Sequence, residues 1–160
     1  MAPYARKAGT TAVVILGLAG WAWTAPALAE SVNLKVVSIR ATNEEKPHID
    51  EELLLLKDAL TLFHYNSFRV AAKRRIAAEI GESTEVALIE GYAMRLEPQE
   101  QTDKSVKLLA TTILYEKDKE GRRVERLLDR ATMTIRKGKF LLRGGWELKE
   151  GVLVTLVAAD

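Results

Sequence analysis

The chain has 160 residues, of which 48% are hydrophobic, and carries 24 Lys and Arg against 22 Asp and Glu, with no cysteine. This length and composition predict one domain with a substantial core. The near balance of charges argues against a general nucleic-acid-binding function, and the lack of cysteine excludes disulfides and thiol chemistry.

The first 29 residues have the pattern of a secretory signal peptide. Arg6 and Lys7 form a positive start, an apolar stretch runs from 10 to 23, and Ala27-Leu28-Ala29 provides an A-x-A cleavage site. We therefore expect export to the periplasm or the extracellular space, with no membrane span once the leader is removed.

The alternative is a retained leader that anchors the protein. Residues 8–29 are long enough to cross a bilayer. Because Arg6 and Lys7 are the only charged residues of the leader, basic and acidic residues balance in 30–160. The expected domain, residues 30–160, therefore has no excess of positive charge.

A strand and a helix are predicted at the start of this domain. Residues 32–41 alternate as a strand, and a polar connection follows it. A helix is predicted over 50–63, with Asp50 as its N-cap and two glutamates in its first turn. Its apolar stripe has helical spacing. The stripe consists of Ile49, Leu53, Leu56, Leu60 and Phe63, widened by Leu54 and Leu55.

The region from 67 to 80 has the clearest strand alternation in the chain. One face is predicted to carry the apolar side chains and to be buried, with Arg74 as an exception. This set is Phe68, Val70, Ala72, Ile76, Ala78 and Ile80. Two shorter strands are predicted over 84–89 and 92–97, followed by a polar loop over 98–104.

Four further strands are predicted over 105–159. The first is apolar on both faces, which indicates a central position. The second, 122–135, changes phase near Leu127–Leu128, which predicts a β-bulge. Gly144-Gly145 is expected to bend the third strand, and 152–159 forms the last.

These elements predict an α+β fold. One amphipathic helix would pack on a curved, mainly antiparallel sheet of about seven or eight strands, as a sandwich or an open barrel. The helix and strands are segregated along the chain rather than alternating, which favours antiparallel pairing.

No catalytic or cofactor motif stands out. The histidines are His48 and His64, and their spacing matches no metal-binding motif, so we expect no metal and no cofactor. His64 fits better as a residue at the end of the predicted helix. No G-x-S-x-G, P-loop or G-x-G-x-x-G motif is present.

Basic side chains on the predicted strands suggest an interaction surface. Arg69, Lys73 and Arg75 are expected to share one strand face, and Arg122, Arg126 and Arg130 to share another. Such a stripe would bind an envelope polyanion or an acidic partner. The alternative is a solvated face balanced by acids. Trp146 joins this surface as a candidate contact, although a core aromatic at a sheet bend is the simpler interpretation.

The segment from Ala131 to Gly145, ATMTIRKGKFLLRGG, resembles the strand–turn–strand–Gly-Gly segment of the outer-membrane secretin domain. The long pore-forming hairpins of that family are missing here, so we expect no pore. Residues 30–160 are also similar to small exported proteins of uncharacterised function in Gram-negative bacteria. That resemblance implies no activity.

Together these patterns predict an exported, non-enzymatic binding or assembly component of the cell envelope, with an envelope protein or polyanion as partner. The alternative is a small periplasmic hydrolase whose active site is not visible as a motif. A pocket lined by His48, His64 or paired acids would favour the hydrolase. A basic sheet face or an unpaired edge strand would favour the binding domain. The sequence leaves the oligomeric state open.

Overall fold

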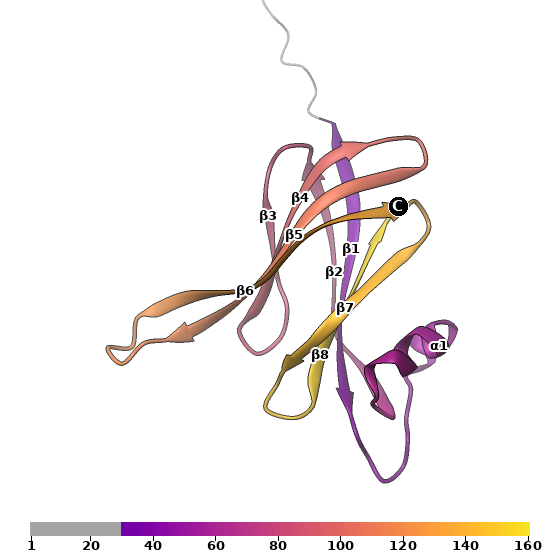
Figure 1. The fold of residues 1–160 in the computed structure, drawn as a ribbon, viewed down its shortest axis with the longest axis vertical. Coiled ribbons are helices and arrows are strands. Elements are labelled where there is room, and N and C mark those ends of the chain that lie inside the picture. Colours follow the sequence, from indigo (N-terminus) through magenta and orange to yellow (C-terminus); the bar gives the residue numbers. More distant parts are fainter. Residues whose placement is uncertain (1–29) are drawn as a thin grey trace, which may run out of the picture.

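The computed structural model describes residues 30–160, so the predicted leader lies outside the described residues. Eight strands and one helical segment make up this part of the chain (Figure 1). The strands are β1 (Ser31–Thr42), β2 (Ser67–Glu79), β3 (Thr84–Ala87), β4 (Tyr92–Gln101), β5 (Ser105–Lys117), β6 (Arg123–Arg136), β7 (Phe140–Glu147) and β8 (Val152–Ala159). Within residues 30–160, no helix has the length and apolarity needed to span a membrane.

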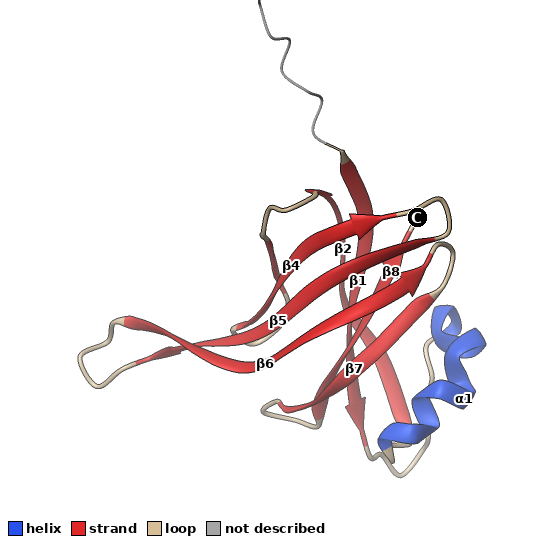
Figure 2. Cartoon of the chain, turned by 45° about the horizontal axis from the view of Figure 1, so that its top comes forward, coloured by secondary structure: helices blue, strands red, loops and turns tan. Residues whose placement is uncertain are grey.

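The strands form two antiparallel sheets of four. The first sheet has the order β2-β1-β8-β7 and the second the order β3-β4-β5-β6 (Figure 2). The predicted strand number and antiparallel pairing are confirmed, but the strands are divided between two sheets rather than forming one curved sheet. The chain leaves the first sheet after β2, builds the second as a meander, and returns with β7 and β8. The last strand therefore pairs with the first.

The two sheets enclose one hydrophobic core, which we call the inner core. The first sheet contributes Val32, Leu34 and Leu153 to it, and the second contributes Met94 and Leu108. All five side chains are almost fully buried. β1 and β8 occupy the centre of the first sheet because both of their faces are apolar, as a strand covered on both sides requires.

The opposite face of the first sheet carries a second core, which we call the helix core. Val37 and Ile39 of β1 and Val154 of β8 point away from the inner core and pack with Leu53 and Leu60 of the helical segment. The predicted role of the helix, to cover one face of a sheet, is confirmed.

The predicted single apolar face of β2 is wrong, because a β-bulge at Ala71 reverses its alternation. Ser38 pairs with Ala72 and the next residue, Ile39, pairs with Val70. Phe68 and Val70 therefore face the helix core, whereas Ile76 and Ala78 face the inner core. Paired residues share a face, so an extra residue in one strand moves the following side chains to the other side.

The bulge predicted near Leu127–Leu128 is confirmed: Thr112 pairs with Asp129, and Ile113 pairs with Leu127, which leaves Leu128 as the extra residue. A further bulge lies at Gly145, so the Gly-Gly pair bends β7 as predicted.

The predicted loop over 98–104 is wrong for its first half. β4 continues to Gln101, and Pro98 pairs with Leu108 of β5. A register shift after Pro98 accommodates this proline in the strand.

The helical segment, Glu51–Phe63, is less regular than predicted. Only α1 (Lys57–Leu60) is α-helical, and it lies between two 3₁₀ turns, η1 (Glu51–Leu56) and η2 (Thr61–Phe63). Asp50 is the N-cap residue, as predicted, but its side chain makes no capping bond. His64 ends the segment in a left-handed conformation with φ of 58°, as expected for a boundary residue.

Candidate binding surface

Three leucines of the helical segment lie on the surface. Leu54 is 52% exposed, Leu55 98% and Leu62 75%, whereas Leu53 and Leu60 are buried. Four consecutive leucines, 53–56, cannot all face one sheet, because neighbouring residues of a 3₁₀ turn point in directions about 120° apart. The prediction that Leu54 and Leu55 widen the buried stripe is therefore wrong. We call Leu54, Leu55 and Leu62 the leucine surface.

Apolar cavities adjoin this surface on two sides. A cavity of about 430 Å³ lies between the helical segment and the preceding loop and is lined by Ile49, Leu54 and Phe68. Another, of about 280 Å³, lies between the helical segment and the first sheet and is lined by Leu55 and Phe140. Phe140 is itself 37% exposed. Apolar groups that a partner could cover thus extend from the helical segment into both hollows.

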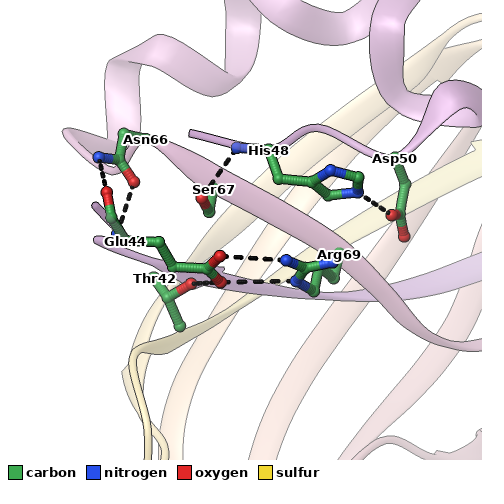
Figure 3. Close-up of polar contacts among 7 residues, drawn as sticks. All are labelled: Thr42, Glu44, His48, Asp50, Asn66, Ser67 and Arg69. Atoms are coloured by element: carbon green, nitrogen blue, oxygen red, sulfur yellow. Dashed lines mark hydrogen bonds and ion pairs between the residues drawn. The ribbon is translucent and has the colours of Figure 1, made fainter. Parts of the chain in front are cut away.

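The loop before the helical segment is fastened to the outer edge of β2 (Figure 3). Ile49 forms a parallel bridge with Phe68. The Asp50 carboxylate accepts a hydrogen bond of 2.7 Å from the Val70 N–H and contacts the His48 ring at 2.9 Å. These two contacts, the backbone one first, hold the pKa of Asp50 below its ordinary value. Asp50 and His48 therefore hold this loop against the edge of β2.

A neighbouring cluster joins the end of β1 to the start of β2 (Figure 3). The Glu44 carboxylate accepts hydrogen bonds from Arg69, at 3.0 Å, and from the Thr42 hydroxyl. Arg69 and then Thr42 lower the pKa of Glu44. Asn66 links to the Glu44 backbone through both its oxygen and its amide nitrogen. Arg69 therefore forms an ion pair with Glu44 within the chain.

The basic residues predicted on β2 do not share one face. Arg69 pairs with Arg40 on the inner-core side of the strand, whereas Lys73 and Arg75 pair with Val37 and Lys35 on the helix-core side. The bulge at Ala71 causes this separation. Lys73 also forms an ion pair with Glu52 of the helical segment.

The basic residues predicted near β6 are divided in the same way. Arg126 shares a face with Leu114, and Arg130 shares the other face with Thr111. Arg122 precedes the strand and pairs with Asp118 at 2.7 Å. The bulge at Leu128 separates Arg126 from Arg130, so a single basic stripe is not formed.

Trp146 packs against the inner core as a partly buried side chain. The bulge at Gly145 brings it opposite Leu153 of β8. This position fits the interpretation of Trp146 as a core aromatic at a sheet bend.

The outer face of the second sheet carries a charge network that the sequence analysis missed. The Arg95 guanidinium bonds both Glu125 oxygens at 2.6 Å and reaches Glu85 at 2.9 Å. The Tyr115 hydroxyl donates to Glu85, and the Arg123 guanidinium lies 3.6 Å from the Tyr115 ring centroid. Glu125 raises the pKa of Arg95, and Arg95 lowers the pKa of Glu125. The residues of this charge network come from four strands, so only knowledge of the strand order could have identified the network.

Among residues 30–160 no group of three or more His, Asp or Glu side chains is arranged to hold a metal ion. His48 contacts Asp50 and His64 ends the helical segment, so the two histidines serve separate local structures.

Comparisons of the chain with protein-family models, with curated proteins and with solved structures give no match.

Proposed function

We propose that residues 30–160 form an exported binding domain of the cell envelope, and that the leucine surface binds a protein partner there. The observation that carries this proposal is the near-complete exposure of Leu55, with Leu54 and Leu62 on the same segment. Most of the surface of these three side chains lies outside both cores, and exposed apolar side chains gathered on one short segment are available for contact with a protein partner.

The charge distribution favours a protein as the binding partner over a polyanion. A polyanion site needs basic groups that are free to bind it. Four of the six predicted basic residues are in ion pairs: Arg69 with Glu44, Lys73 with Glu52, Arg122 with Asp118, and Arg126 with Glu116. Only Arg75 and Arg130 have no such partner within residues 30–160. An apolar contact surface with a charged rim agrees better with a protein interface.

The test is site-specific photo-crosslinking in the producing cell, with the crosslinking residue at Leu55. We expect a discrete adduct of constant mass, abolished when Leu62→Glu is added. The matched control places the crosslinker at Glu82, an exposed turn residue away from the helical segment, where no such adduct should form. Equal adducts at both positions, or an adduct insensitive to Leu62→Glu, would exclude the leucine surface as the binding site.

Export is tested separately by sequencing the N-terminus of the protein recovered from the envelope fraction. A start at Glu30 supports the proposed leader. A protein that retains residues 1–29 in the membrane would show an anchor instead, and recovery from the cytoplasm alone would contradict export.

A hydrolase remains the second candidate because His48 and Asp50 are hydrogen-bonded beside the 430 Å³ cavity. Asp50 is the one side-chain partner of the His48 ring in the described part of the chain. Hydrolysis of ester or peptide substrates that is lost in His48→Ala would support this candidate. The same variant should leave the Leu55 crosslink unchanged if the binding proposal is correct.

A further inference from the structure

β6 is an edge strand of the second sheet. It pairs with β5 and has no strand partner on its other side within residues 30–160. The turn end of the β5–β6 hairpin projects beyond both sheets (Figure 2). Val124 and Leu127 in this region are 46% and 58% exposed. A long edge strand with exposed apolar groups is available to pair with another strand.

The sequence of β6 is complementary to itself in the antiparallel direction. Its middle reads Glu125-Arg-Leu-Leu-Asp-Arg130. When two copies are related by a two-fold axis between Leu127 and Leu128, Glu125 of each copy lies opposite Arg130 of the other. Arg126 likewise lies opposite Asp129, which gives four opposite-charge pairs.

The bulge at Leu128 makes this pairing possible. Opposed residues of antiparallel strands must lie on the same face, but residues three or five apart in a regular strand lie on opposite faces. Glu125 and Arg130 pair with Tyr115 and Thr111 of β5, which are four apart and therefore share a face. The extra residue Leu128 thus brings Glu125 and Arg130 to one side.

The same holds for the second pair. Arg126 and Asp129 pair with Leu114 and Thr112, which share the other face of β5.

Neighbouring registers are unfavourable. A shift by one residue in one direction places Glu125 opposite Asp129, and a shift in the other direction places Arg126 opposite Arg130. Like charges directly opposite each other destabilise a sheet. The charges therefore select one register.

We propose that two copies of this chain associate through antiparallel pairing of their β6 edges, centred between Leu127 and Leu128, so that the two second sheets become continuous. Three of the four charged residues already have partners within the chain: Glu125 with Arg95, Arg126 with Glu116, and Asp129 with Arg143. Arg130 is in no ion pair within residues 30–160, and pairing supplies one. The contact consists mainly of one strand edge, so it belongs to the class of small, weak interfaces.

A charge-swap experiment with protein produced from the full 160-residue chain tests the register. Arg130→Glu places like charges opposite each other in its own homodimer, and Glu125→Arg does the same. An equimolar mixture of the two restores both pairs in a heterodimer. By sedimentation velocity we expect each variant alone to dimerise roughly tenfold more weakly than the wild type, and the mixture to recover.

The matched control is Lys119→Glu, which makes the same charge change as Arg130→Glu but lies in the turn of the hairpin. It should leave dimerisation unchanged. A wild-type protein that stays monomeric up to about 1 mM overturns the proposal. So does an Arg130→Glu variant that dimerises as strongly as the wild type, and so does a mixture that fails to recover.

Glu125→Arg also loses the contact with Arg95, so a second measurement avoids this position. The chain has no cysteine, and Val124 should lie opposite Ala131 of the other copy. A mixture of Val124→Cys and Ala131→Cys chains should form a mixed disulfide readily. Val124→Cys mixed with Thr132→Cys, whose side chain lies on the other face, should do so far more slowly. Equal rates would contradict the proposed register.

Discussion

Asp50 shows how a single carboxylate organises the region around the leucine surface. It accepts the Val70 N–H, next to the bulge at Ala71, and it orients His48 beside the larger cavity. The bonds that lower its pKa stabilise the ionised form in the folded protein. The charged carboxylate therefore adds to the backbone bonds that hold this loop on β2.

A pH dependence follows from the direction of that shift. Because the pKa of Asp50 is lower in the folded protein than its ordinary 3.8, its contribution to stability is present above pH 3.8 and is lost as the pH falls through the folded value. We expect Asp50→Asn to reduce the free energy of unfolding by about 1 kcal/mol at pH 7. The gap from the wild type should close below pH 3.8. Urea unfolding at several pH values measures it, and a constant gap would contradict this role.

Two glycines offer a matched comparison at the residue scale. Gly151 and Gly121 have similar positive φ values, 74° and 78°. A Cβ at Gly151 would lie 2.0 Å from the Ala41 carbonyl oxygen, whereas one at Gly121 would meet nothing within 4 Å. We expect Gly121→Ala to lower the free energy of unfolding by about 1 kcal/mol from backbone strain alone. Gly151→Ala should lower it by at least about 2 kcal/mol more. Equal losses would show that β1 yields to the added methyl group.

At the scale of elements, three of the four β-bulges or register shifts in residues 30–160 determine which of the discussed side chains meet. The bulge at Ala71 assigns the two halves of β2 to different cores, the bulge at Leu128 separates Arg126 from Arg130, and the bulge at Gly145 brings Trp146 to the inner core. In each case one extra residue changes the face of every side chain that follows it.

The helical segment gives a direct test of which leucines support the fold. Leu60 is fully buried in the helix core, and Leu62, two residues later, is 75% exposed. We expect Leu60→Ala to lower the free energy of unfolding by about 2–5 kcal/mol through the cavity it leaves. Leu62→Ala should change it by no more than about 0.5 kcal/mol. A large loss in the Leu62 variant would mean that this side chain contributes to the core.

The helical segment, the strands and their bulges show how much of the fold the sequence could predict. Strand positions, the helical segment and the bulge at Leu128 follow from local alternation and spacing, and they were predicted. The bulge at Ala71 was missed because the apolar residues of β2 keep a spacing of two across it, with Arg74 as the one exception, so only the pairing with β1 reveals it.

The candidate surface was less predictable than the fold. Leu54 and Leu55 were assigned to the buried stripe, but Leu53 and Leu60 alone fill the buried positions and the other two leucines lie on the surface. The prediction of a basic stripe is wrong because the face on which each basic side chain lies depends on the strand register. Local sequence patterns identify helices and strands. Which side chains meet on a surface depends on the strand register and the order of strands in each sheet, and a single sequence does not show either.

At the scale of the whole molecule, the two cores are parts of one cooperative structure. β1 and β8 each contribute side chains to the inner core on one face and to the helix core on the other. Thr155, fully buried in β8, donates a hydrogen bond to the Arg143 carbonyl and so adds to the link between β8 and β7. Loss of either core should therefore disrupt the other.

We accordingly expect one unfolding transition. With Trp21 and Trp23 replaced by Phe, Trp146 becomes the sole tryptophan and reports on the inner core. Adding Leu60→Ala, a change in the helix core, should move the midpoints of Trp146 fluorescence and of far-ultraviolet circular dichroism by equal amounts. Separate midpoints would indicate that the cores unfold independently.

The pairing of β1 with β8 also decides when this chain can fold. β1 needs β8, the last strand of residues 30–160, as its neighbour, since Leu34 lies opposite Ala159. A nascent chain that lacks its final strand leaves both apolar faces of β1 without their central neighbour, and contacts between distant residues form slowly. Slow pairing of β1 with β8 would keep the chain unfolded for longer, which suits the passage through a secretion channel that the proposed export requires.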